Sequence, residues 1–334
     1  MLIDTLNRPI HDLRISVIDR CNFRCPYCMP EDEISKHYTF LKETQWLTFE
    51  EITRLTELFV SVGAEKVRLT GGEPLLRPDL DVLIKNLSQI SKIKDLALTT
   101  NGSLLAKYAS KLRDAGLRRL TVSLDTLDSR VFKVMSGNKG HLTQVLDGIK
   151  AAEEAGFNSL KINVVVQKGV NDATFMDLVR YFKGTKHVLR FIEYVDVGNC
   201  NHWQWKYVVP SKEILQTINK HFLLTPLDPN YFGEVAERYQ FVDGGGEIGF
   251  ISSVSQPFCG SCTRLRLSAD GKMFTCLFAH DGVDLSAPLR NGASDATLLN
   301  LIKETWSKRS DRYSELRSKT HHNSQRVEMF QIGG

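Results

Sequence analysis

Three cysteines lie within eight residues near the start of the chain. Cys21, Cys25 and Cys28 have the spacing CxxxCxxC, and Tyr27 directly precedes the last of them. Thiolates select iron–sulfur clusters, zinc or copper(I) over metals that prefer oxygen ligands. Because most clusters take four cysteines, a cubane cluster on three of them leaves one iron open to a small molecule. The alternative is a zinc knuckle that takes a fourth ligand such as His37, although zinc pairs usually have the spacing CxxC.

A second group of three cysteines lies near the other end of the sequence. Cys259 and Cys262 form a CxxC pair, and Cys276 follows after thirteen residues. Because His280 comes four residues later, this segment also has the composition of a Cys₃His zinc site. Zinc and a cluster both stay open for this segment alone, and the first cysteine group favours a second cluster. The seventh cysteine, Cys200, is expected to be a buried thiol without a ligand role.

The strands and helices that would position the two cysteine groups follow one repeated pattern. Between residues 13 and 194, short β-rich runs alternate six times with helical stretches. Such alternation predicts a parallel sheet with right-handed crossovers, and six units are fewer than the eight of a complete barrel. We therefore predict an α/β fold, a partial (β/α)6 TIM-like barrel. Strands are expected at 13–18, 66–70, 96–100, 119–124, 159–166 and 188–194, and helices at 48–63, 78–90, 104–115, 141–155 and 172–183.

The pattern changes after about residue 210. Two β-hairpins are predicted, 237–242 with 247–252 and 263–268 with 272–276, and helical segments follow between 294 and 317. We expect residues 1–210 to form the barrel and residues 211–334 to form a smaller α+β part that covers the open barrel.

Glycine and polar residues gather where the predicted barrel strands end. Active sites of barrels lie at the carboxyl ends of their strands, and glycine lets the backbone approach a ligand closely because it has no Cβ. The segments in question are the first cysteine group, Gly71-Gly72-Glu73-Pro74, Thr99-Thr100-Asn101-Gly102 and Ser123-Leu124-Asp125. We expect them to meet at one mouth.

The composition is that of an ordinary soluble globular protein, with 42% hydrophobic and 25% charged residues among 334. The net charge of +4 is too small to predict a nucleic-acid-binding protein. Residues 1–14 contain no apolar core, and no apolar run approaches the ~20 residues of a membrane span. Seven cysteines then indicate metal binding or catalysis in a reducing compartment, so we expect a cytoplasmic protein that does not bind a membrane.

The first cysteine motif, placed directly after a predicted strand, resembles the signature of the radical S-adenosylmethionine (SAM) enzymes. From about residue 14 to residue 334 the chain resembles the GTP 3′,8-cyclases of molybdenum cofactor (molybdopterin) biosynthesis. The matching features are the second cysteine group followed by Arg264-Leu265-Arg266, the Gly-Gly end, and the motifs at 69–74, 99–102, 122–125 and 191–194.

The resemblance implies two [4Fe–4S] clusters, on Cys21, Cys25 and Cys28 and on Cys259, Cys262 and Cys276. The open iron of the first would chelate SAM, and that of the second would receive the guanine of GTP. Reductive cleavage of SAM would yield a 5′-deoxyadenosyl radical that removes hydrogen from ribose C3′. The carbon radical would then attack C8, and the product would be (8S)-3′,8-cyclo-7,8-dihydroguanosine 5′-triphosphate.

The resemblance also implies roles for single residues. The expected SAM contacts are Tyr27, Gly72, Ser123 and Val195, the last at a position where the family usually has methionine. The expected GTP contacts are Arg14, Arg68, Thr99, Lys161, Arg264, Leu265 and Arg266, with Lys66 and Arg190 as further candidates. A triphosphate would pair the cations that lie inside apolar runs, where unpaired charge is costly. Arg14, Arg264 and Arg266 are the catalytic candidates, and the Gly-Gly tail would reach toward them.

The resemblance implies GTP as the small-molecule partner, together with a reductant protein and the next enzyme of the pathway. A homodimer is an open option. Two other functions are kept as alternatives. One is a radical SAM enzyme with an auxiliary cluster that modifies peptides, against which the Arg-Leu-Arg motif and the Gly-Gly end argue. The other is a non-enzymatic protein with two structural zinc sites.

Overall fold

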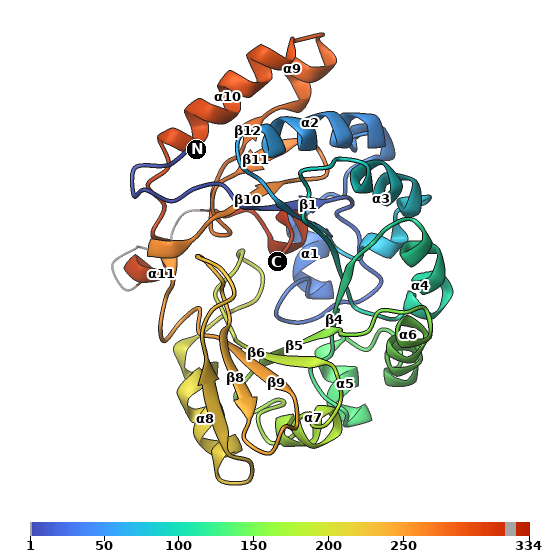
Figure 1. The fold of residues 1–334 in the computed structure, drawn as a ribbon, viewed down its shortest axis with the longest axis vertical. Helices are drawn as coiled ribbons and strands as arrows, with labels where there is room; N and C mark the ends of the chain where they lie inside the picture. Colours follow the sequence, from blue (N-terminus) through green and yellow to red (C-terminus); the bar gives the residue numbers. More distant parts are fainter. Residues whose placement is uncertain (1, 318–324) are drawn as a thin grey trace.

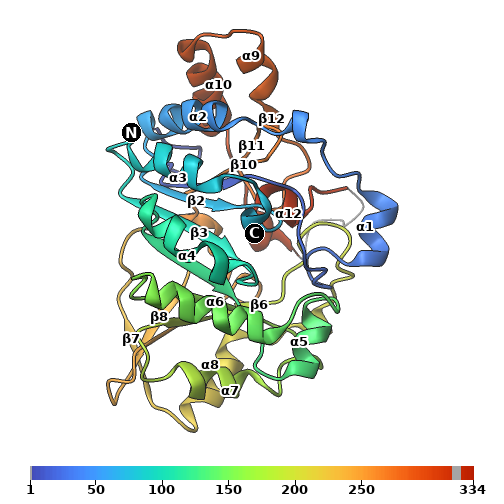
Figure 2. The same cartoon turned by 90° about the vertical axis from the view of Figure 1, so that its right-hand side faces the viewer.

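The computed structural model describes residues 2–317 and 325–334, and these form one curved β-sheet with helices on its outer side. The strand order is β12-β11-β10-β1-β2-β3-β4-β5-β6-β9-β8-β7, so the sheet is open and its two edges are β12 and β7. Figure 1 shows the strands curving around a central space, and Figure 2 shows the same layers from the side. The α/β partial barrel predicted from the sequence is confirmed.

The six central strands pair in parallel in the order of the sequence. They are β1 (Asp12–Ser16), β2 (Lys66–Thr70), β3 (Asp95–Thr100), β4 (Arg119–Ser123), β5 (Lys161–Val166) and β6 (Val188–Glu193). Each lies within two residues of its predicted bounds. Their alternate side chains face the outer helices and the inner space, as the period of two requires.

The predicted helices are confirmed as α2 (Phe49–Ser61), α3 (Leu80–Ser88), α4 (Leu105–Asp114), α6 (Leu142–Glu154) and α7 (Phe175–Phe182). Helix α2 begins at a capping box, in which Thr48 and Glu51 exchange side chain–backbone hydrogen bonds of 2.8 and 3.2 Å. Two short helices, α1 (Glu31–His37) and α5 (Ser129–Met135), were not predicted.

The C-terminal part extends the sheet at both sides. Strand β10 (Arg264–Leu267) pairs in parallel with β1, and β9 (Glu247–Ile251) pairs in parallel with β6. The remaining elements are β7 (Leu224–Leu227), β8 (Glu237–Phe241), β11 (Lys272–Phe274), β12 (Val283–Asp284), α8 (Ser211–Asn219), α9 (Ser286–Arg290), α10 (Asp295–Ser307), α11 (Tyr313–Leu316) and α12 (Met329–Ile332). Both predicted hairpins are present, as β8–β9 and β10–β11.

The C-terminus lies inside the curved sheet. Figures 1 and 2 both place it within the ring of strands. A Cβ added to Gly333 would lie 2.1 Å from Thr70 Cγ2, so the tail packs tightly against the end of β2. No helix of the described residues is long and apolar enough to cross a membrane.

One buried carboxylate joins the barrel to the C-terminal part. Glu193, at the end of β6, is fully buried. It accepts hydrogen bonds from the backbone N–H groups of Ser211 (2.8 Å), Val254 (2.7 Å) and Ser255 (2.8 Å), and from the Ser255 hydroxyl. A buried carboxylate is stable in such a place because its lone pairs are satisfied by converging donors.

We predict that Glu193→Gln lowers the free energy of unfolding by about 2–4 kcal/mol, because the amide NH₂ group would face donors where the carboxylate oxygen accepts. Urea unfolding followed by circular dichroism measures this. Glu237→Gln, at the exposed start of β8, is the matched control and should leave the midpoint unchanged. An equal midpoint for the two variants would show that this junction contributes little.

Candidate functional site

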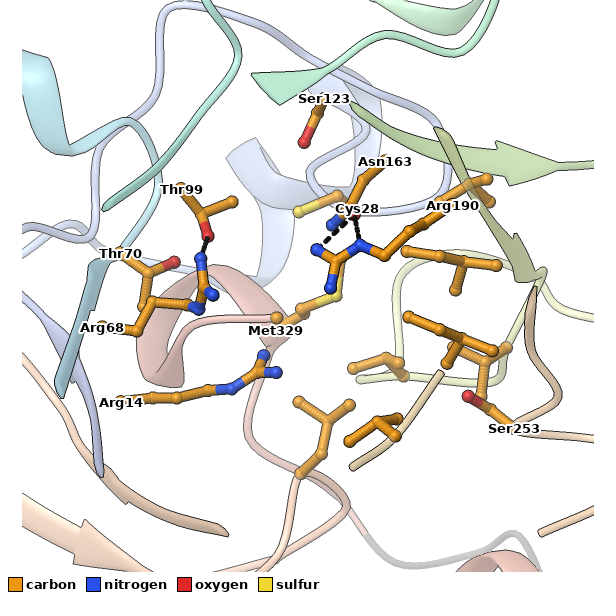
Figure 3. Close-up of a pocket in the computed structure, with 18 of the residues that line it drawn as sticks. Arg14, Cys28, Arg68, Thr70, Thr99, Ser123, Asn163, Arg190, Ser253 and Met329 are labelled. Carbon is orange, nitrogen blue, oxygen red and sulfur yellow. Dashed lines mark hydrogen bonds between the residues drawn. The ribbon is translucent and has the colours of Figure 1, made fainter. Parts of the chain in front are cut away.

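A single cavity inside the curved sheet brings together most of the predicted site residues. Its lining includes Cys21, Cys25, Cys28, Arg14, Tyr27, Arg68, Gly72, Thr99, Ser123, Lys161, Val195, Arg264 and Arg266, and also Lys66 and Arg190. Figure 3 shows several of these side chains converging from different strands. The lining also contains residues that no motif indicated: Asp12, Asn163, Tyr231, Glu234 and Met329.

The first cysteine group faces this cavity as a unit. Burial raises the pKa of Cys25, and the neighbouring charges of Cys28 and Cys21 raise it further. Burial also raises the pKa of Cys21 to about 11. Such thiols need a metal partner to exist as thiolates, which is the form that binds metal. Three such thiols that line one cavity fit the cysteine ligands of an iron–sulfur cluster. The side chain of His37 lies outside the described residues.

The loops around these cysteines are held by hydrogen bonds between strand ends. Glu73 is buried and accepts from the Thr100 hydroxyl (2.7 Å) and the Asn101 N–H (2.7 Å), and burial raises its pKa to about 7. The Asn101 amide in turn donates to Asn22 Oδ1 at 2.8 Å and lies 3.8 Å from Cys21 Sγ. The motifs after β2 and β3 therefore fix the position of the cysteine loop.

Glycine is required at Gly71 and Gly72 for packing. Gly71 has φ +145°, and an added Cβ would lie 2.3 Å from the Ile18 carbonyl oxygen. An added Cβ at Gly72 would lie 2.2 Å from the Arg20 carbonyl oxygen. From the sequence, close approach of a ligand is the expected reason for these glycines. In the structure, the space that a Cβ would need is filled by the backbone of residues 18–21, which leads into the cysteine loop. Both glycines still line the cavity.

Tyr27 is anchored between the cysteine loop and β4. Its hydroxyl donates to Asp125 Oδ2 at 2.8 Å, while Asp125 Oδ1 accepts from the Val165 N–H at 2.8 Å. Burial raises the pKa of Asp125 to about 6. Ser123 and Val195 also line the cavity.

Three arginines lie side by side on adjacent strands. Arg14 on β1 is in register with Arg266 on β10 and with Arg68 on β2. Burial and the charges of Arg266, Arg264 and Arg68 lower the pKa of Arg14. Arg68 donates to the Thr99 hydroxyl at 2.9 Å (Figure 3). It also donates to the Thr121 hydroxyl at 2.9 Å. The result is a row of positive charge that faces the cavity.

Two further cations line the cavity, Lys161 from β5 and Arg190 from β6. Arg190 donates to Asn163 Oδ1 at 3.0 and 2.7 Å, and burial together with Arg68 and Arg119 lowers its pKa to about 9. Burial, Arg190 and Arg119 lower the pKa of Lys161 to about 7. Cations whose charged forms are disfavoured in this way gain most from an anionic ligand.

Leu265 is an exception among the predicted contacts. It is fully buried in the apolar core, and it is absent from the cavity lining. Side chains alternate along a strand, so Leu265 faces away when its neighbours Arg264 and Arg266 face the cavity. A contact from this residue to a ligand would have to come from its backbone.

The second cysteine group flanks the β10–β11 hairpin: Cys259 and Cys262 precede β10, and Cys276 follows β11. Burial and Asp311 raise the pKa of Cys276 to about 11, whereas the charges of Arg264 and Arg309 overcome burial and lower the pKa of Cys262 to about 6. Arg309 Nη2 donates to Cys262 Sγ at 3.2 Å. The three cysteines Cys259, Cys262 and Cys276 are not on the lining of the cavity.

The histidine that the sequence offers as a fourth zinc ligand bonds elsewhere: His280 Nδ1 lies 2.8 Å from the Gln325 carbonyl oxygen. Zinc remains the alternative to a cluster for this cysteine group.

The C-terminal tail reaches the arginines, as expected. Arg266 donates to the carbonyl oxygen of Ile332 at 3.2 Å and to that of Gly333, and Gly334 lines the cavity. The thiol of Cys200 is buried, as predicted, and lies 3.4 Å from Glu328 Oε1 just before the tail.

Comparison with protein families gives two adjacent matches. Residues 15–182 match the model described as the radical SAM superfamily, and residues 187–315 match the model described as Molybdenum Cofactor Synthesis C. Together they cover the central sheet and most of the C-terminal part.

Curated relatives are similar over almost the whole chain. A GTP 3′,8-cyclase of Xanthomonas axonopodis pv. citri (strain 306) is 55% identical over 331 residues, which are 99% of this chain and 98% of the relative. GTP 3′,8-cyclases of Acidothermus cellulolyticus and Staphylococcus aureus (strain JH9) are 50% and 48% identical, each over 99% of this chain and 98% of the relative.

Among solved structures, Streptococcus suis SuiB bound to S-adenosylmethionine is similar with a TM-score of 0.62 at 16% identity. The match covers 95% of this chain and 69% of SuiB. At this identity the likeness shows the fold.

The lowered pKa of Lys161 predicts proton uptake when a polyanion binds. At pH 8 the empty site holds this amine mostly neutral, and a bound anion favours the charged form, so inorganic triphosphate should bind with uptake of up to one proton. Uptake should vanish near pH 6, where the amine is already charged. Calorimetry in buffers of different protonation enthalpy measures it.

Lys161→Met should abolish this uptake, while Lys168→Met, at an exposed position, is the control and should retain it. Equal uptake in the Lys161 variant and the wild type would place the titrating group elsewhere.

Proposed function

The chain belongs to the GTP 3′,8-cyclase family of the radical SAM superfamily, and we propose that it cyclises GTP to (8S)-3′,8-cyclo-7,8-dihydroguanosine 5′-triphosphate, the first step of molybdenum cofactor biosynthesis. The observation that carries this proposal is the joining of a cysteine group and a set of buried cations on one cavity. The cysteines suit a cluster with an open iron, and the cations suit a nucleoside triphosphate.

The cofactors of the superfamily are SAM and a [4Fe–4S] cluster, which Cys21, Cys25 and Cys28 would hold. When bound, they supply a 5′-deoxyadenosyl radical that takes hydrogen from ribose C3′. We further propose a second [4Fe–4S] cluster on Cys259, Cys262 and Cys276. Besides burial and Asp311, the charge of Cys262 acts on the Cys276 thiol and raises its pKa, which places these two thiols near each other and supports this proposal.

The cavity residues divide into two working groups under this proposal. Tyr27, Gly72, Ser123 and Val195 would line the SAM side, near the first cysteine group. The GTP side would be formed by Arg14, Arg68, Thr99, Lys161, Arg264, the Leu265 backbone and Arg266, with Lys66 and Arg190. The protein's own contribution is to bind and orient the reactants and to exclude water, since the cofactors carry the difficult chemistry.

The three arginines near the tail are proposed to act on the base and ribose. Arg266 is oriented by the tail carbonyls of Ile332 and Gly333, and Arg14 is its neighbour in register. With Arg264, they would place positive charge beside the guanine as it gains an electron and a proton. Lys161 Nζ would take up its proton on binding of the triphosphate.

The proposal extends to the cellular location, the partners and the assembly of the enzyme. We propose that the enzyme works in the cytoplasm with a reductant protein and passes its product to the next pathway enzyme. The division at residue 210 into a barrel and a C-terminal part also stays a proposal, and so does a homodimer.

An isotope experiment tests the reaction. Protein reconstituted anaerobically with iron and sulfide receives SAM, a strong reductant and GTP deuterated at C3′, and the 5′-deoxyadenosine is weighed by mass spectrometry. We expect deuterium in it, and none of this product from Cys25→Ser. Unlabelled 5′-deoxyadenosine formed equally with and without GTP would instead favour another substrate, such as a peptide.

Metal analysis tests the two-cluster proposal without relying on activity. Cys262→Ser should lose roughly four irons and the accompanying sulfide per chain relative to the wild type, because a cubane cluster contains that number. Cys200→Ser is the matched control, since its thiol is buried against Glu328, and it should keep the full content. Colourless protein with two zinc ions would support the structural-zinc alternative.

A further inference from the structure

A loop that no sequence motif indicated closes the cavity at the end where the strands begin. Residues 228–236 connect β7 to β8, and Tyr231, Glu234, Val235 and Ala236 from this loop line the cavity. Asp12 and Lys66, the first residues of β1 and β2, lie at the same end.

The loop spans the open side of the sheet. Strand β8 lies toward one edge of the strand order, and β10 toward the other. Gly233 has φ +83°, and an added Cβ would lie 2.7 Å from the Ser261 carbonyl oxygen and 2.9 Å from Thr263 Cγ2. The loop therefore packs against the segment that leads into β10, and this contact holds Tyr231 in place.

Tyr231 contacts Lys66 in two ways, and each of the two residues has one further partner. Lys66 Nζ donates to the Tyr231 hydroxyl, and it also lies 4.5 Å from the centre of the tyrosine ring. The ring stacks on His11 with centroids 5.1 Å apart and an interplanar angle of 27°. Lys66 forms a further ion pair of 3.2 Å with Asp12. The position of the ammonium is thus set by Asp12 and Tyr231 together.

The tyrosine hydroxyl retains a proton to donate. It accepts from Lys66, and within residues 2–317 and 325–334 no acceptor takes the phenolic proton. Burial and the charge of Asp12 raise the pKa of Tyr231, so the hydroxyl stays protonated. Tyr231 also stands within electrostatic reach of Arg68 and Arg190. Its free donor is therefore placed among the cations that suit phosphate.

We propose that Tyr231 is a specificity-determining residue for the phosphate end of the substrate: it positions Lys66, and it donates its hydroxyl proton to the terminal phosphoryl group, which makes the cavity prefer a nucleoside triphosphate over a diphosphate. This inference rests on the proposed function. Tyr231 lies in a loop, outside the cysteine groups, the glycine motifs and the row formed by Arg14, Arg68 and Arg266.

Tyr231→Phe isolates the hydroxyl, since the ring, its stacking on His11 and its contact with the ammonium are retained. Hydrogen bonds to charged groups are worth about 1.5–3 kcal/mol, so the dissociation constant for GTP should rise about ten- to hundredfold. Binding of GDP and guanosine should change much less. The GTP concentration that gives half-maximal 5′-deoxyadenosine formation should rise in step with this dissociation constant, because the hydroxyl contacts the terminal phosphoryl group.

Tyr239→Phe is the matched control, because it removes a phenol hydroxyl from the same hairpin at a residue that does not line the cavity. It should leave all three affinities unchanged. A double-mutant cycle of Tyr231→Phe with Lys66→Gln tests the positioning role: the two losses in GTP affinity should be clearly non-additive.

The outcomes separate this inference from the proposed function. A wild type that converts GTP, with a Tyr231→Phe variant that binds GTP equally well or loses affinity for GTP, GDP and guanosine alike, would overturn the inference and leave the function intact. A wild type that neither converts GTP nor prefers it over guanosine would overturn both.

Discussion

The structure depends on positive charge that is buried and only partly compensated. Arg266, Arg14 and Arg68 are in register on three adjacent strands, so their spacing is set by the ~4.8 Å distance between neighbouring strands. Their hydrogen-bond partners include the hydroxyls of Thr99 and Thr121 and carbonyls of the tail. These dipoles solvate the charges without neutralising them, and buried unpaired charge costs several kcal/mol per ion. The apolar outer face of the sheet must offset that cost, and a polyanion would relieve it.

The alternation of side chains along each strand makes this arrangement possible. Leu13 and Ile15 flank Arg14 and are fully buried in the apolar core, as are Leu265 and Leu267 around Arg266. One short segment therefore supplies both the core under the helices and the charge of the cavity. A shift of one residue in the pairing of β1 with β10 would exchange the two faces, so the same register that builds the core also places the arginines.

Much of the fold could be predicted because its signals are local. The bounds of β2 and the capping box of α2 follow from neighbouring residues. The parallel pairing of β10 with β1 could not be predicted, since Leu13 and Leu265 are far apart in the sequence and no local pattern reports their contact. For the same reason Tyr231 was missed: its role follows from Lys66 and from the packing of Gly233 on a distant loop. The role of Gly71 in backbone packing likewise needs the position of Ile18.

The two cysteine groups have the same number of thiols but differ in the charges around them, although a carboxylate, Asp311, also acts on Cys276 in the second group. The charges of Glu73 and Asp125 act on Cys21 and Cys25, whereas Arg264 and Arg309 act on Cys262, and Arg309 donates directly to its sulfur. Neighbouring charge and hydrogen bonds to sulfur tune the reduction potential of a cluster. Negative surroundings favour the loss of an electron, and positive surroundings favour the retention of negative charge. Under the proposal of two clusters, the carboxylates near Cys21 and Cys25 would make the first a better electron donor, and the arginines beside Cys262 would stabilise negative charge on the second.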